Sequence, residues 1–155
     1  MGGGCPGSQT LSFNQPASLK MDSPETGSAS ALQQWPVQLH LVNPNAPYYR
    51  GADVVIAADC TAFSLGNFHG KYLKGKSLAI ACPKLDSNLE VYVNKITTMV
   101  DQANINTLHV MIMEVPCCGG LLQIVKQGVG AAKRKVPVKY TVVGIQGEVV
   151  QEQWL

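Results

Sequence analysis

The fold is decided by the stretch Leu108-His-Val-Met-Ile-Met-Glu-Val-Pro-Cys-Cys-Gly-Gly120. It is a nearly uninterrupted apolar run that ends in a proline, two adjacent cysteines and two glycines. Such runs are typical of strands that are buried on both faces of a parallel sheet. The carboxyl ends of these strands are where α/β proteins bind ligands. The stretch therefore predicts a ligand-binding edge with Cys117 and Cys118 on it, and Gly119-Gly120 would let the backbone approach the ligand.

Two other apolar runs end in cysteine in the same way. Val54-Val-Ile-Ala-Ala-Asp59 runs into Cys60, and Ser77-Leu-Ala-Ile-Ala81 runs into Cys82. A single cysteine at a strand end is most often a small buried hydrophobe. Three strands that deliver four thiols to one edge are much harder to explain in that way, so this edge is the strongest functional signal in the sequence.

Strand patterns alternate with helix patterns along the chain. The expected strands cover residues 37–42, 53–58, 77–81, 108–115 and 136–145, and the expected helices cover 61–73 (short and broken), 89–103 and 121–132. This alternation predicts an α/β fold, a three-layer sandwich with a mainly parallel sheet of about five strands, Rossmann-like or flavodoxin-like. The sequence does not give the strand order, and residues 146–155 stay unassigned.

Local signals refine the helices. Ser87 and Glu90 have the spacing of a capping box at a helix start, and Gly128 and Gly130 are expected to let a helix pack closely on the sheet. Residues 1–30 are rich in Gly, Ser, Pro, Gln and Thr, a composition that cannot fold alone. We expect a flexible arm over residues 1–30, carrying Cys5, followed by a single α/β domain over residues 31–155.

Composition excludes several function classes. A formal charge of +2 on 155 residues argues against a nucleic-acid-binding protein, which needs a concentrated basic face. The basic cluster Lys133-Arg-Lys135 is explained by the end of a helix. No stretch reaches the roughly 18 apolar residues of a membrane helix, and the first residues do not resemble a signal peptide. The sequence therefore predicts a cytoplasmic protein whose five cysteines serve metal or thiol chemistry rather than disulfides.

Gathered thiolates favour zinc, copper(I) or iron–sulfur clusters. We expect Cys60, Cys82 and Cys117 to be the main ligands, with Cys118 and Cys5 as further ones. A 4Fe–4S cluster is the leading cofactor and zinc the alternative. Two other hypotheses remain: a thiol or sulfur-chemistry enzyme with Cys117 or Cys118 as its nucleophile, and an interaction module stabilised by zinc or with structural cysteines only. Whether the protein is an enzyme is therefore open.

Residues beside the cysteines are weaker candidates. His69 follows Cys60 closely enough to approach the site, although an ordinary surface role explains it better. Asp59 would either orient a ligand or cap a helix. Asp86, just past Cys82, could reach the pocket, but a turn role explains it adequately.

Several separated motifs carry a resemblance to a known family. They are Gly3-Gly-Cys-Pro-Gly-Ser8, Gln34-Trp-Pro-Val-Gln-Leu39, Ala57-Ala-Asp-Cys60, Ala79-Ile-Ala-Cys-Pro-Lys-Leu-Asp86, Met113-Glu-Val-Pro-Cys-Cys-Gly-Gly120 and Gly144-Ile-Gln-Gly-Glu148. Together they resemble the ferredoxin-type iron–sulfur binding proteins of anaerobic bacteria and archaea, over almost the whole chain. The resemblance implies iron–sulfur redox biology and a ferredoxin-type electron-transfer partner or domain.

This sequence departs from that family at its start. The family's domain usually follows an amino-terminal ferredoxin module with two CxxCxxCxxxCP motifs, which this chain lacks. The chain is thus either a carboxy-terminal domain of a longer protein or a natural short form. The resemblance names neither a reaction nor an oligomeric state.

Overall fold

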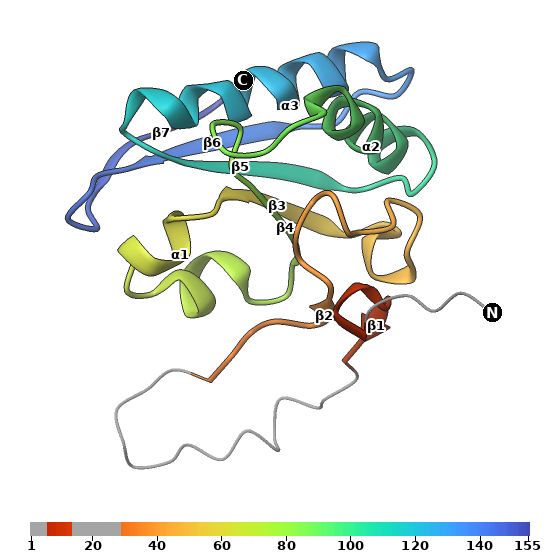
Figure 1. Cartoon of the computed structure of the whole chain (residues 1–155), viewed down its shortest axis with the longest axis horizontal. Coiled ribbons are helices and arrows are strands. Elements are labelled where there is room, and N and C mark those ends of the chain that lie inside the picture. The colour runs from red at the N-terminus through yellow and green to blue at the C-terminus, as the bar shows by residue number, and fades with distance from the viewer. Residues whose placement is uncertain (1–5, 14–28) are drawn as a thin grey trace.

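A computed structural model describes residues 6–13 and 29–155 of the chain. Within these residues, five strands form one sheet in the order β4-β3-β5-β6-β7 (Figure 1). Their bounds are β3 Asp53–Ala58, β4 Ser77–Ala81, β5 Thr107–Met113, β6 Val138–Val143 and β7 Val149–Trp154. The first four strands are parallel and β7 runs antiparallel to β6. The prediction of a mainly parallel sheet of about five strands is confirmed.

The order of the strands reverses beside β3. The chain moves from β3 outward to β4, then returns past β3 to β5 and continues to β6. Counted from β3, this is the 2-1-3-4-5 order of flavodoxin-like sheets, in which ligands bind at the reversal. The carboxyl ends of β3 and β5 therefore flank the position where an α/β sheet most often carries its ligand.

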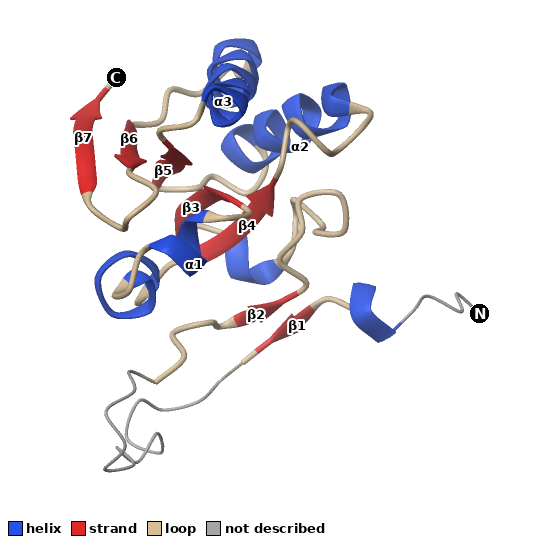
Figure 2. Cartoon of the chain, turned by 60° about the vertical axis from the view of Figure 1, so that its left-hand side comes forward, coloured by secondary structure: helices blue, strands red, loops and turns tan. Residues whose placement is uncertain are grey.

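Helices cover both faces of the sheet (Figures 1 and 2). On one face lie α2, Leu89–Asp101, and α3, Gly119–Ala131; on the other lie the short α1, Thr61–Ser64, and the π-helical turn η4, Phe68–Leu73. The expected three-layer sandwich is thus observed. The core between the layers is made of the strands' aliphatic side chains, and Val54, Ile56 and Val110 are completely buried.

The five strands are not the five that the sequence predicted. Residues 37–42, expected to form a strand, make only an isolated parallel bridge between Gln38 and Ile80. The chain then turns, because the N–H groups of Leu41 and Val42 both donate to the carbonyl oxygen of Gln38. The fifth strand is instead β7, in the segment that the sequence left unassigned.

The amino-terminal arm falls mostly outside the described residues. Residues 1–5, with Cys5, and residues 14–28 belong to that undescribed part. Between them, strand β1, Leu11–Ser12, pairs antiparallel with β2, Gln34–Trp35. Trp35 Nε1 also donates to the carbonyl oxygen of Gly7 at 2.7 Å. The part of the arm that the structure describes is therefore held against the segment that leads into the domain.

The expected capping box of α2 does not form. The helix begins at Leu89, and its N-cap is Asn88 in the left-handed conformation, without a side-chain capping bond. A capping box needs serine at the N-cap itself, and here Ser87 lies one residue too early. Its carbonyl oxygen instead accepts a hydrogen bond from His40 Nε2 at 2.6 Å.

Helices α2 and α3 touch at Gly128. A Cβ built on Gly128 would lie 2.7 Å from Ile96 Cγ2 and 3.1 Å from the carbonyl oxygen of Val93, whereas a Cβ on Gly130 meets nothing within 4 Å. Thr97 Oγ1 donates to the carbonyl oxygen of Gly128 at 2.8 Å. The expectation that both glycines pack on the sheet is wrong: only Gly128 makes a close approach, and its neighbour is helix α2.

Replacing Gly128 with alanine should lower the free energy of unfolding by about 1–2 kcal/mol, because overpacking outweighs the helix propensity that alanine adds. Gly130→Ala on the same helix is the matched control and should leave stability unchanged or raise it by up to about 1 kcal/mol. Urea unfolding measures both. Equal stabilities of the two variants would contradict the close helix contact.

Candidate thiol site at the carboxyl edge of the sheet

Three neighbouring strand ends carry the cysteines. Strand β3 lies between β4 and β5, and the three strands run in the same direction. Cys60 follows β3, Cys82 follows β4, and Cys117-Cys118 follow β5. The four thiol-bearing residues therefore lie along one edge of the sheet, and Cys60 and the Cys117-Cys118 pair flank the reversal of strand order.

The cysteines differ in exposure. Cys60 and Cys117 are exposed, Cys82 is intermediate and Cys118 is buried. Cys60 immediately precedes α1, and Cys118 immediately precedes α3. The first N–H groups of a helix have no partner inside the helix and carry partial positive charge that favours a thiolate. The 13-residue helix α3 therefore stabilises a thiolate at its amino end more effectively than the short helix α1 does.

Three of the thiols interact electrostatically. The pKa of Cys118 is raised, first by burial and then by the charges of Cys117 and Cys60, against an opposing backbone hydrogen bond at Met113. Like charges affect each other in this way only when they are near. Burial and the neighbouring thiols therefore make Cys118 a weaker acid than an ordinary thiol, which lowers its reactivity as a nucleophile.

Cys82 is held by a tight turn. Its N–H donates to Asp86 Oδ2 at 2.9 Å, and its carbonyl oxygen accepts from the N–H groups of Leu85 and Asp86. The hydroxyl of Tyr92, on α2, donates to the same Asp86 oxygen. The turn role of Asp86 was expected. Tyr92 was missed, because its position carries only the signal of an apolar helix face.

The Cys82 turn lies against the start of α3. A Cβ on Gly120 would come within 3.3 Å of Pro83 Cβ, while a Cβ on Gly119 would meet nothing within 4 Å. Gly120 therefore permits a close approach between the segments that carry Cys82 and Cys118. The sequence predicted that both glycines let the backbone approach a ligand; the space beside Gly119 is open, and Gly120 lies against Pro83.

The β4 side of this edge is acidic. Burial, and then the charge of Asp86, raise the pKa of Asp59. Burial and the hydrogen bond to Asp86 raise the pKa of Tyr92, with smaller contributions from Asp59 and Cys82. Asp59 Oδ1 accepts a long hydrogen bond from Gln38 Nε2, at 3.4 Å. Two carboxylates, one after β3 and one in the Cys82 turn, thus share this edge with the thiols and the amino end of α3.

A single metal ion has no ready site here. Among the described residues, no group of three or more His, Cys, Asp or Glu side chains is arranged to hold one ion. Thiolates at ~2.3 Å from one tetrahedral zinc stand about 3.8 Å apart, whereas the thiolates of an iron–sulfur cluster bind different irons and stand farther apart. The described side chains therefore form no ready-made site for a single ion, and Cys5 lies outside the described residues.

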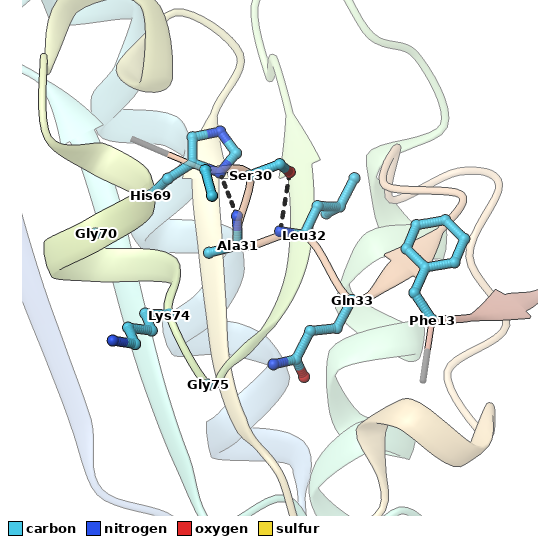
Figure 3. Close-up of a pocket in the computed structure, with 10 residues that line it drawn as sticks. Phe13, Ser30, Ala31, Leu32, Gln33, His69, Gly70, Lys74 and Gly75 are labelled. Carbon is cyan, nitrogen blue, oxygen red and sulfur yellow. Dashed lines mark hydrogen bonds between the residues drawn. The ribbon is translucent and has the colours of Figure 1, made fainter. Parts of the chain in front are cut away.

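His69 belongs to a different part of the molecule. Its Nδ1 accepts a hydrogen bond from the N–H of Ala31 at 3.0 Å, beside a cavity of about 600 Å³ (Figure 3). Phe13, Leu32 and Lys74 also line this cavity, and none of the described cysteines does. Phe13 and Ala29, another lining residue, border the undescribed residues 14–28. His69 is half-buried, and its hydrogen bond to Ala31 agrees with the ordinary role expected for it.

Comparison with known proteins agrees with this architecture. Residues 46–155 match the model of a family described as Rossmann-like domain. The chain belongs to this family. This Rossmann-like domain is also 30% identical over 118 residues to a protein of Archaeoglobus fulgidus described as an uncharacterized protein, over 76% of this chain and 82% of the relative. No solved structure matches it.

The family assignment covers the fold and is coarser than the iron–sulfur resemblance drawn from the sequence motifs. It carries no ferredoxin association. In the described part of the Rossmann-like domain, no helix is long and apolar enough to cross a membrane.

Proposed function

We propose that this domain is an electron-transfer module that binds an iron–sulfur cluster, most simply a 4Fe–4S cluster, at the carboxyl edge of its sheet. Cys60, Cys82, Cys117 and Cys118 are the ligand candidates there, and Cys5 is a further one. The observation that carries the proposal is the placement of cysteines on three adjacent strand ends around the reversal of strand order. When bound, such a cluster supplies one-electron chemistry.

The polar surroundings support a charged cofactor at this edge. The amino end of α3, directly after Cys118, favours thiolates and offsets the negative charge of a cluster. The carboxylates of Asp59 and Asp86 have the opposite effect, because their negative charge disfavours thiolates and a negatively charged cluster. A cluster beside these carboxylates would have a lower reduction potential than one beside α3 alone, because negative charge disfavours the added electron.

Exposed apolar side chains support a partner at this edge. Phe63, on α1, is 94% exposed, and Leu85, in the Cys82 turn, is 83% exposed. Both lie within three residues of a cysteine. Electron-transfer partners use small, transient interfaces. Two exposed apolar side chains are enough to contribute to an interface of that kind. The resemblance of the cysteine motifs to ferredoxin-type proteins makes a ferredoxin-type protein or domain the proposed partner in the cytoplasm.

A second candidate function is thiol chemistry at Cys117. Cys117 is exposed and comes two residues before α3, where partial positive charge favours a thiolate nucleophile. Burial and neighbouring charges raise the pKa of Cys118, so Cys117 is the better nucleophile of the pair. The third possibility, a zinc-stabilised interaction module, lacks a preformed zinc site among the described residues.

The metal content of anaerobically purified protein separates these functions. We expect iron and acid-labile sulfide in equal amounts, with broad visible absorption that bleaches on reduction. Zinc without iron would overturn the cluster and favour the interaction module. Metal-free protein that resists cluster reconstitution, with Cys117 alkylated faster than the other thiols at neutral pH, would overturn it in favour of the enzyme.

A further inference from the structure

A second cavity lies at the opposite edge of the sheet from the cysteines. It encloses about 210 Å³. Its wall comes from η4, the segment before β4, the starts of β5 and β6, and the end of β7; the lining residues used below are Lys71, Lys76, His109, Lys139, Glu152 and Trp154. Because β7 is antiparallel to β6, its last residues reach the amino ends of the parallel strands. Residues far apart in the sequence therefore enclose one small space.

The charge around this cavity is unbalanced. Its lining contains Lys71, Lys76 and Lys139 but only one carboxylate, Glu152. Within residues 6–13 and 29–155, the ion pair Lys139–Glu152, at 2.6 Å, is the one salt bridge closer than 4 Å. The charge of Lys76 acts on Asp53, but the Asp53 carboxylate is occupied by hydrogen bonds from Asn106 and Thr107. Lys71 and Lys76 thus border the cavity without a contacting counter-charge from the described residues.

Hydrogen bonds and an ion pair connect part of the cavity lining. His109 is 93% buried, being 7% exposed, and its Nε2 lies 2.7 Å from Thr141 Oγ1. Thr141 in turn donates to Glu152 Oε2 at 3.1 Å. On the wall, Lys139 Nζ lies 5.7 Å from the centre of the Trp154 ring. This network holds Lys139 and Glu152 beside the cavity, so Glu152 is occupied by Lys139 and does not neutralise the other two lysines.

His109 does not add charge to the free cavity. Burial, followed by the charges of Lys76 and Lys139, lowers its pKa to about 4, and Glu152 opposes this shift. The imidazole is neutral at pH 7, and its second nitrogen, Nδ1, has no hydrogen-bond partner among the residues that the structure describes. A bound anion would offset the two lysine charges and so raise the pKa of His109.

We infer that this cavity is a binding site for a small phosphate-bearing anion, separate from the thiol edge and independent of the function proposed for it. Lysine ammonium groups bind phosphate as point charges, and Lys71 and Lys76 are available for that role. The cavity is smaller than the ~300 Å³ of the smallest pockets that hold drug-sized ligands. A pyrophosphate or a short phosphomonoester fits this description better than a nucleotide does.

Titration calorimetry of the full chain tests the inference. The probes are inorganic pyrophosphate and glycerol phosphate, with citrate as an anion of comparable charge that lacks phosphate. We expect binding of at least one phosphate probe and weakening by about tenfold in Lys71→Gln and in Lys76→Gln, since each change removes one charge-assisted hydrogen bond to the anion. Pyrophosphate binding alone would identify a free polyphosphate, and glycerol phosphate binding alone a phosphorylated metabolite.

Lys74→Gln is the matched control. Lys74 is an exposed lysine just after η4, but it lines the other cavity, so this variant should bind as the wild type does. Equal weakening in Lys74→Gln would show general charge attraction and overturn the site, as would tighter binding of citrate than of either phosphate probe. Absence of binding at millimolar probe would also overturn it. The His109 ring signals in NMR provide a second readout and should titrate at higher pH with the probe bound.

Discussion

Serine in place of Cys60, Cys82 or Cys117 is expected to abolish cluster loading in each single variant. Each thiolate holds a different iron in a cluster, so the loss of one leaves an iron without its protein ligand. The fold should survive, because Cys60 and Cys117 are exposed and Cys82 is only half-buried, so none of the replacements empties the core. The measurement is iron and sulfide content after anaerobic reconstitution, together with the visible spectrum.

Two comparisons make this result specific. Phe63→Ser changes a 94% exposed side chain three residues after Cys60 and should leave iron content unchanged. Thermal unfolding of the metal-free variants should match that of the metal-free wild type. Full iron content in all three cysteine variants would refute the proposed cluster site. Loss of iron in the Cys60 and Cys117 variants, with full iron content in the Cys82 variant, would place the cluster at the ends of β3 and β5, with Cys118 as a further ligand.

Gln34→Leu is expected to lower the free energy of unfolding by about 1–3 kcal/mol, the cost of leaving a buried backbone N–H group without a partner. Gln34 is 1% exposed and serves as a hydrogen-bonding partner for edge strand β4. Its Oε1 accepts from the N–H of Leu78 at 2.7 Å, and its Nε2 donates to the carbonyl oxygen of Leu78 at 2.8 Å. Leucine would leave that N–H without a partner, while the carbonyl keeps the hydroxyl of Tyr49.

The neighbouring glutamine is the control for this prediction. Gln33 is exposed, so Gln33→Leu should change stability by no more than about 0.5 kcal/mol. Urea unfolding of the metal-free protein compares both variants with the wild type. If Gln34→Leu were as stable as Gln33→Leu, the side chain of Gln34 would not be protecting the edge of the sheet.

Prediction succeeded where local pattern and tertiary burial agree. The bounds expected for the strands at 53–58 and 77–81 are those observed, because each is a short apolar run bounded by polar or turn residues. Both strands are buried inside the sheet layer, so the hydrophobic signal is strong. The cysteines that follow them could be placed at the edge for the same reason.

Prediction failed where exposure or a distant partner decides the structure. Strand β7 is exposed along its whole length, so it carries no alternation of apolar and polar residues, and pairing with β6 alone defines it. Residues 37–42 alternate well but turn away after one bridge to Ile80. The cavity at the amino edge could not be found from the sequence, since its lysines come from three separate segments.

The sequence by itself determined the α/β class, the parallel strands and the cysteines at their carboxyl ends, because these follow from short-range periodicity and chain direction. Tertiary structure alone decided the strand order and therefore which thiols are neighbours. It also decided that Cys118 is buried while Cys117 is exposed, and that Gln34 completes the edge of β4. These features depend on contacts between residues tens of positions apart, and local sequence patterns do not encode such contacts.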